Sequence, residues 1–142
     1  MRRISDGKVP LTRILVVDDN AAIRRCLRRL FEDRDDWQVY AEAGDGQEAV
    51  QRFQQVHPDL VVLDFQMPAM NGFEAAREMI HIAPAVPILM LSVHYSKQLA
   101  DEARHIGIRG ACAKGDISCV VEAAEALLRK ETYFQQPNSI GS

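Results

Sequence analysis

Short apolar runs alternate with longer amphipathic stretches along almost all of the 142 residues. Five runs have the length and composition of buried strands, and a stretch with helical periodicity follows each of them. Strands separated by helices form parallel sheets covered by helices on both faces. We therefore predict an α/β fold, a doubly wound five-stranded parallel sheet of the form (βα)5. The predicted strands are residues 13–19, 37–44, 59–64, 86–92 and 109–114, and the predicted helices are residues 21–33, 46–56, 72–82, 96–107 and 117–130.

The hydrophobic patterns of the five strands predict their order in the sheet. Residues 13–19, 59–64 and 86–92 are continuously apolar, as expected of strands that are buried on both faces. Residues 37–44 alternate between apolar and polar, and residues 109–114 are only weakly apolar, as suits edge strands. This predicts the strand order 2-1-3-4-5, in which ligands bind beyond the carboxyl ends of the strands, between the first and the third.

Residues that begin or end helices stand at the predicted boundaries. Asp45 precedes the second helix and Glu48 follows three residues later, in the pattern of a capping box. Pro58 ends that helix, because proline cannot continue the helical hydrogen-bond ladder. Gly107 is expected to end the fourth helix, and Asp116 is expected to cap the last one.

The chain is expected to form one domain, residues 12–130, between a flexible leader (1–11) and a loose linker or tail (131–142). Its 47% hydrophobic and 26% charged content suits a packed core under a polar surface. The net charge of −3 gives no global basic field to attract nucleic acid. No window approaches about 18 consecutive apolar residues, and the leader lacks the apolar stretch of a secretion signal. We therefore expect a cytoplasmic protein with no membrane partner.

Two groups of side chains receive ordinary interpretations. The cysteines, Cys26, Cys112 and Cys119, are odd in number and match no metal-binding spacing, so free thiols in a reducing compartment are expected. The arginines of the first helix lie largely off its apolar stripe, and the overall acidity of the chain favours a solvated helix face. They are Arg24, Arg25, Arg28 and Arg29.

Polar residues stand at the carboxyl ends of four predicted strands. Asp18 and Asp19 end the first strand, Asp64 the third, Ser92 the fourth and Lys114 the fifth. Each residue alone has an ordinary explanation. Aspartate is common in turns and helix caps, and a lysine that follows a weakly apolar strand is usually solvated. The predicted topology, however, brings all five to one crevice.

This group of residues has the chemistry of a phosphoryl-binding site. Clustered carboxylates repel one another, and a cation or a proton relieves the repulsion. Their oxygen ligands suit Mg²⁺, which keeps several waters. A metal and an ammonium group together neutralise the charge on phosphoryl oxygens. Asp64 lies on the central strand and is the natural nucleophile, whereas Asp18 and Asp19 are better placed as metal ligands.

The same residues lie in the motifs "LVVDDN", "DLVVLDFQMPAMNG", "ILMLS" and "GACAKGD". Through these motifs, residues 12–130 resemble the receiver domain of two-component response regulators, a CheY-like domain of flavodoxin-like fold. The resemblance implies that Asp64 accepts a phosphoryl group from a sensor histidine kinase or from a small phosphodonor. It also implies that Lys114 binds the phosphoryl oxygens and that Ser92 hydrogen-bonds to the phosphoryl group.

The resemblance further implies how a metal is held and how the domain signals. Mg²⁺ would be bound by Asp19, Asp64 and the backbone carbonyl of Gln66, with Asp18 in support. Ser92 would draw the following loop inward and so change the surface of the fourth helix, fifth strand and fifth helix. In the family this surface also forms homodimers upon phosphorylation.

The motif region departs from the family pattern at the residue three before the lysine. This position is Ala111, whereas receivers usually carry Tyr or Phe there. An alanine cannot signal by changing rotamer, so the usual switch is in doubt. Tyr95, in the loop after Ser92, is a candidate substitute, the alternative being an ordinary exposed loop tyrosine.

Two further features resemble the NarL/LuxR-type regulators. Gly115 and Asp116 follow the lysine where many receivers have proline, and the segment "RKETYF" is similar to the start of a linker in that group. Such regulators continue into a helix-turn-helix domain. A role in DNA binding is therefore expected only through an output domain that this sequence does not include.

The loop after Asp64 contains two more motif residues. Pro68 lacks an N–H group and fixes φ, which shapes the loop. Gly72 is expected to allow an unusual backbone dihedral at the start of the third helix.

Three alternative functions remain open. A phosphatase with an aspartate nucleophile would need a second acid where Gln66 stands. An FMN-binding protein would need a Ser-, Thr- or Gly-rich loop after the first strand, but "DDNAAIRR" offers acids. A pseudo-receiver, acting only as an interaction surface, is disfavoured by the complete set of site residues but favoured by Ala111.

Overall fold

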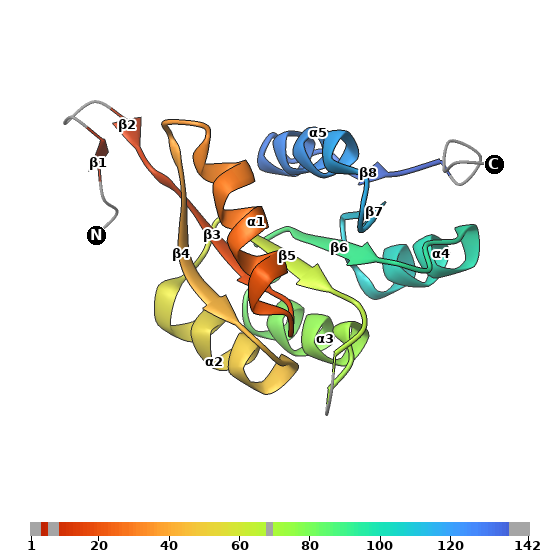
Figure 1. Ribbon diagram of the computed structural model, residues 1–142. Helices are drawn as coiled ribbons and strands as arrows, with labels where there is room; N and C mark the ends of the chain where they lie inside the picture. Colours follow the sequence, from red (N-terminus) through yellow and green to blue (C-terminus); the bar gives the residue numbers. More distant parts are fainter. Residues whose placement is uncertain (1–3, 6–8, 68–69, 137–142) are drawn as a thin grey trace.

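The computed structural model describes residues 4–5, 9–67 and 70–136 (Figure 1). Within these residues the helices are α1 (Ala21–Glu32), α2 (Gly46–Val56), α3 (Gly72–Ile82), α4 (Lys97–Ile106) and α5 (Ile117–Leu128). The strands are β1 (Ile4–Ser5), β2 (Val9–Pro10), β3 (Thr12–Val17), β4 (Trp37–Ala43), β5 (Leu60–Asp64), β6 (Ile88–Ser92), β7 (Gly110–Ala113) and β8 (Tyr133–Phe134).

The main sheet has the order β4-β3-β5-β6-β7-β8, and all of its strand pairs are parallel. The first five of these strands reproduce the predicted order 2-1-3-4-5, which is confirmed. Strands β5 and β6 are buried at every residue, whereas β4 alternates between buried and half-buried residues. The central strands therefore have the continuous apolar pattern because both of their faces are covered.

Short strands also lie outside the five predicted strand–helix units. β1 and β2 form an antiparallel pair within the predicted leader. The prediction of a loose tail is wrong for residues 133–135, because β8 pairs with β7 and Gln135 is buried. Residues 137–142 of the expected tail lie outside the described residues.

Helices cover both faces of the main sheet and enclose two hydrophobic cores (Figure 1). One core lies between the sheet and helices α2, α3 and α4, and includes Phe53, Phe73 and Met79. The other lies between the sheet and helices α1 and α5, and includes Phe31 and Leu127. This packing fixes the strands, so that their carboxyl ends lie together at one edge.

Most of the predicted helix boundaries are confirmed. The Asp45 side chain accepts a hydrogen bond from the Glu48 amide at 2.8 Å, and Asp116 caps α5 in the same way. Gly107 ends α4 with a φ of 113°, a left-handed conformation that glycine adopts without strain. α2 ends one residue before His57, which directly precedes Pro58.

The expectation of free thiols is wrong for two cysteines. Cys112 on β7 and Cys119 in the first turn of α5 form a disulfide, with their Cα atoms 6.3 Å apart. Their separation of seven residues gave no signal, because the pairing depends on how α5 packs against β7. Cys26 is the free cysteine among the described residues.

Candidate functional site

The carboxyl ends of four parallel strands bring the five predicted site residues together. Asp18 and Asp19 follow β3 directly, Asp64 and Ser92 are the last residues of β5 and β6, and Lys114 follows β7. Asp18, Asp64 and Ser92 are buried, Lys114 is half-buried and Asp19 is exposed. The cluster is therefore open to solvent on the side of Asp19.

Three carboxylates form the centre of the site. One oxygen each of Asp18, Asp19 and Asp64 lies within 4.8 Å of the others. The Lys114 ammonium lies 2.7 Å from Asp18 Oδ2 and 3.3 Å from Asp64 Oδ2, so it forms ion pairs with both buried acids. This cation offsets part of the cost of burying two carboxylates next to each other.

The surroundings shift the pKa values of two groups in the cluster. Burial raises the pKa of Asp64 and the charge of Asp18 raises it further, while Lys114 opposes both effects. Burial alone would lower the pKa of Lys114, but its hydrogen bond to Asp18 and the charges of both acids raise it overall. Lys114 therefore stays charged, and Asp64 is destabilised as a carboxylate in a way that an added cation relieves.

The donor set fits a divalent cation. Three carboxylate oxygens, two from buried residues and one from an exposed residue, make a hard oxygen site with one open side. Such a site suits Mg²⁺, which binds through a few carboxylates and retains waters. Asp18, Asp19 and Asp64 are therefore compatible with Mg²⁺ binding at this cluster.

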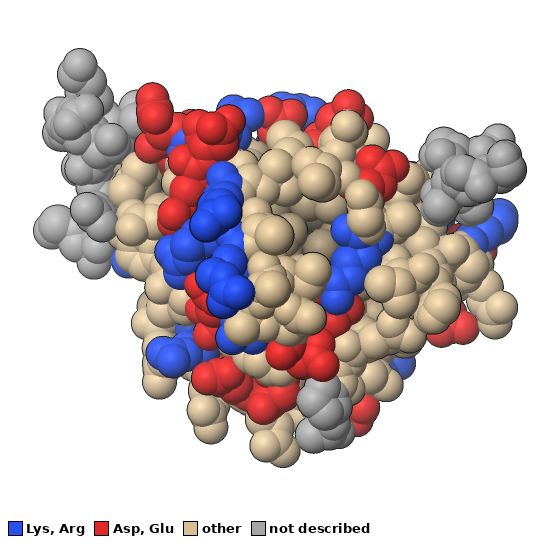
Figure 2. Space-filling view, viewed as in Figure 1, with Lys and Arg blue, Asp and Glu red and all other residues tan. Residues whose placement is uncertain are grey.

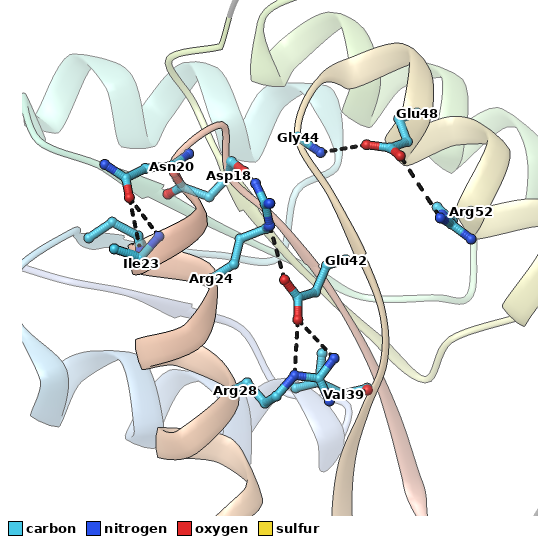
Figure 3. Close-up of polar contacts among 11 residues, drawn as sticks. Asp18, Asn20, Ile23, Arg24, Arg28, Val39, Glu42, Gly44, Glu48 and Arg52 are labelled. Carbon is cyan, nitrogen blue, oxygen red and sulfur yellow. Dashed lines mark hydrogen bonds and ion pairs between the residues drawn. The ribbon is translucent and has the colours of Figure 1, made fainter.

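Arg24 on α1 holds the backbone of Asp18 in place (Figure 3). Its Nη1 donates a hydrogen bond to the Asp18 backbone carbonyl at 2.7 Å, and its Nε donates to Glu42 on β4 at 3.0 Å. The Asn20 backbone amide donates to Asp18 Oδ1 at 2.9 Å, while the Asn20 side-chain oxygen caps α1. The turn after β3 is thus held at both its carbonyl and its carboxylate.

The prediction of a solvated arginine face is only half correct. Arg25 and Arg29 are exposed, but Arg24 and Arg28 are half-buried and both pair with Glu42. Burial alone would raise the pKa of Glu42, but the two arginines lower it overall. Figure 2 shows basic side chains gathered over α1 with acidic side chains beside them. Sequence periodicity missed this pairing because Glu42 lies on a different element.

The start of α3 packs closely against the backbone of Asp64 and Phe65 at Gly72. The expected unusual dihedral is wrong, because Gly107 is the glycine with positive φ among the described residues. A Cβ at Gly72 would instead lie 2.8 Å from Phe65 Cα and 3.0 Å from the Asp64 carbonyl oxygen. Glycine is needed there because the start of α3 approaches the backbone behind Asp64. Pro68 lies outside the described residues.

The loop after β6 connects Ser92 to the C-terminal segment. Ser92 Oγ accepts a hydrogen bond from the His94 amide at 3.1 Å. The Tyr95 hydroxyl donates to the backbone carbonyl of Gln135 at 2.7 Å, so Tyr95 is not an ordinary exposed loop tyrosine. The sequence could not reveal that Gln135 is the partner of Tyr95, because residue types alone do not predict that the tail returns to the sheet.

Gln66 is exposed two residues after Asp64. Its backbone amide donates a hydrogen bond to Asp64 Oδ1 at 3.3 Å. The residue is therefore next to the acidic cluster, where its backbone carbonyl was predicted to contribute.

No helix in the described part of the chain has both the length and the hydrophobicity to cross a membrane.

Comparison with known proteins assigns the chain and its fold to one family. The family model for the response regulator receiver domain matches residues 14–128. A two-component response regulator of the LuxR family from Aurantimonas sp. SI85-9A1 is 34% identical, with a TM-score of 0.85 over 92% of both chains. The response regulator domain of CheB from Thermotoga maritima is 28% identical, with a TM-score of 0.74 over 84% of this chain and 95% of that one.

Curated relatives carry this domain within longer proteins of different kinds. A protein-glutamate methylesterase/protein-glutamine glutaminase from Paramagnetospirillum magneticum is 39% identical over 79% of this chain and 31% of its own length. The transcriptional activator protein ExaE from Pseudomonas putida is 34% identical over 87% of this chain and 58% of its own length. The chain thus spans between about a third and three fifths of these two relatives.

Proposed function

The chain belongs to the response regulator receiver domain family, and we propose that it is the phosphoacceptor module of a two-component phosphorelay. One observation carries this proposal: the Asp64 carboxylate lies within 4.8 Å of two other acids and 3.3 Å from the Lys114 ammonium. A receiver domain implies a histidine kinase as its partner in general. The donor of the phosphoryl group is therefore a phosphohistidine or a small acyl phosphate.

Each site residue has a distinct proposed role. An Asp64 carboxylate oxygen attacks phosphorus, forming a P–O bond as the bond to the donor breaks. Asp19, Asp64 and the Gln66 backbone carbonyl would hold Mg²⁺, with Asp18 in support, and the metal would supply positive charge next to the phosphoryl oxygens. Lys114 moves from the two acids to the phosphoryl oxygens.

Ser92 is proposed to report the new state. Its oxygen accepts from the His94 backbone amide at 3.1 Å, and its own O–H proton is proposed to be donated to a phosphoryl oxygen. Such a movement pulls on the loop between β6 and α4. We propose that the surface of α4, β7 and α5 changes in response and forms a homodimer interface when Asp64 is phosphorylated.

The output is proposed to be transcriptional. Similarity to the LuxR-family regulator from Aurantimonas sp. and to the activator ExaE favours a NarL/LuxR-type regulator with a DNA-binding domain outside this sequence. The methylesterase relative shows that receivers also accompany enzymatic domains, so a chemical activity belongs to other domains in such proteins. For this chain we propose a cytoplasmic regulatory domain, not an enzyme in its own right, with slow self-dephosphorylation.

Phosphorylation by acetyl phosphate tests the proposal directly. With Mg²⁺, we expect mass spectrometry to detect one phosphoryl adduct on the wild-type protein. The adduct is expected to disappear in Asp64→Asn, but to persist in Asp35→Asn, which changes an exposed aspartate between α1 and β4. A wild-type protein that forms no adduct with acetyl phosphate or any kinase would support the pseudo-receiver instead. Rapid release of phosphate over many turnovers would support a phosphatase.

A further inference from the structure

The chain segment 133–135 lies along the outer edge of β7, between α4 and α5 (Figure 1). The Tyr133 amide donates to the Arg109 carbonyl at 3.0 Å, and the Gln135 amide donates to the Ala111 carbonyl at 3.0 Å. The Tyr133 hydroxyl also donates to Glu122 on α5 at 2.9 Å. The segment therefore closes the sheet edge, which is otherwise open to pairing.

Gln135 makes more hydrogen bonds than Tyr133 or Phe134 and is only 7% exposed. Its Oε1 accepts from the Ala113 amide at 2.7 Å, and its Nε2 donates to Asp116 Oδ2 at 2.8 Å. Its backbone carbonyl accepts from the Tyr95 hydroxyl at 2.7 Å. One buried residue thus joins two loops, the one between β6 and α4 (93–96) and the one between β7 and α5 (114–116).

The same two loops carry or directly follow the groups that would contact a phosphoryl group. Residues 93–96 follow Ser92, and residues 114–116 begin with Lys114. The Lys114 ammonium already lies 3.3 Å from Asp64. Movement of Ser92 toward Asp64, in contrast, would displace residues 93–96 relative to residues 114–116, because the serine side chain is short. Because Gln135 holds both loops, its hydrogen bonds resist that displacement.

Phe134 occupies the region beside the small residue at position 111. Phe134 pairs in register with Ala111, which is fully buried, and packs against the same core as Tyr95. The Arg104 guanidinium of α4 lies 4.1 Å from the Phe134 ring centroid, a cation–π contact. An aromatic ring is therefore supplied to this region by β8, although β7 carries only an alanine there.

We propose that the 133–135 segment is an intramolecular brake that binds the α4–β7–α5 face in the unphosphorylated protein and is released when Asp64 is phosphorylated. This inference rests on the proposed phosphoacceptor function. Release is transmitted through Tyr95 and Asp116 to Gln135, and it uncovers the edge of β7. The readout thus uses a tail residue in place of an aromatic side chain at position 111.

Because coupling between two binding events is reciprocal, the brake can be measured either through segment release or through binding of a phosphoryl mimic. If a phosphoryl mimic weakens segment binding by some factor, then complete detachment of the segment tightens binding of the mimic by the same factor, and partial weakening tightens it by less. Removal of one such hydrogen bond changes an equilibrium constant by about 5-fold. We therefore expect beryllofluoride with Mg²⁺ to bind about 3- to 10-fold more tightly to Gln135→Ala than to wild type.

Amide hydrogen exchange, followed by NMR on the whole chain, tests the release. With Mg²⁺ and beryllofluoride, we expect the Tyr133 and Gln135 amides to exchange at least about 5-fold faster than with Mg²⁺ alone. Amides of β4, at the opposite edge of the sheet, serve as an internal control. Fluorine NMR reports beryllofluoride bound at Asp64 in the same samples.

The outcomes separate this inference from the proposed function. Bound beryllofluoride with unchanged exchange at Tyr133 and Gln135 would overturn the brake and leave the phosphoacceptor function intact. No bound beryllofluoride would overturn both. Tyr95→Phe, which removes one hydroxyl, is expected to tighten binding about 3-fold if Gln135→Ala fails to fold. Tyr40→Phe on β4 is the matched control, and an equal effect there would contradict the inference.

Discussion

Gly72→Ala is expected to destabilise the domain because the new methyl group has no free space. The added Cβ would lie 2.8 Å from Phe65 Cα, 3.0 Å from the Asp64 carbonyl oxygen and 3.3 Å from the Phe65 carbonyl oxygen. All three are backbone atoms, so no side-chain rotation relieves the contact. Either α3 must move away from β5, or the backbone of Asp64 and Phe65 must shift.

The size of the effect follows from two opposing contributions. Overpacking of a well-packed region costs about 1–3 kcal/mol. Alanine in a helix is more favourable than glycine by up to about 1 kcal/mol, and less than that in the first turn, where Gly72 lies. We therefore expect the free energy of unfolding to fall by about 1–2 kcal/mol, which lowers the melting temperature by roughly 3–6 °C.

Urea denaturation followed by circular dichroism measures this change. Gly115→Ala is the matched control, because its Cβ would have no heavy atom within 4 Å and its φ is not positive. The control is expected to change the free energy of unfolding by less than about 0.5 kcal/mol, or to increase it slightly. Gly72→Ala should also slow formation of the acetyl phosphate adduct, since Asp64 is displaced. A Gly72→Ala protein as stable as Gly115→Ala would refute the close-approach argument.

Two other properties of the chain lead to measurable predictions. Burial and the charge of Asp18 raise the pKa of Asp64 in the folded protein above its ordinary value of 3.8. Ionisation of Asp64 therefore destabilises the folded state at a pH above this raised pKa, and the destabilisation disappears as the pH falls toward 3.8. Without metal, Asp64→Asn should therefore melt at a higher temperature than wild type at pH 7, with a difference that shrinks in acid, and a lower melting temperature at pH 7 would contradict this. Reduction of the Cys112–Cys119 disulfide should lower the free energy of unfolding by about 2 kcal/mol, as measured in urea with and without dithiothreitol. The reductant should have no effect on Cys119→Ser, and an unchanged wild type would show that the disulfide does not contribute.

The hydrophobic pattern was sufficient to predict five of the six strands of the main sheet and their order, but not β8. Strands β5 and β6 are continuously apolar because helices cover both of their faces, and β4 alternates because it lies at an edge. The same topology places the carboxyl ends of the strands together. Asp18, Asp64 and Lys114 therefore lie close to one another, although up to 96 positions separate them in the chain.

Contacts that depend on packing between distant segments could not be predicted in this way. Arg24 and Arg28 looked like solvated helix residues because the helical period shows which way they face, but not that Glu42 lies opposite them. Gly72 was recognised as a motif residue, yet its role is to let α3 approach β5, which no local rule describes. Local patterns predict elements, whereas side-chain partners follow from their three-dimensional arrangement.

The alanine at position 111 illustrates why a missing motif residue does not by itself remove a function. Considered alone, Ala111 suggests that the switch is defective, because its side chain has no rotamer to change. In the structure Phe134 pairs with Ala111, and Gln135 connects Tyr95 to Asp116. A bulky side chain at position 111 would occupy space beside Phe134, so the small residue and the added strand are compatible features. The small residue on β7 and the aromatic residue on β8 therefore belong to one arrangement, and the proposed brake gives the tail a part in signalling.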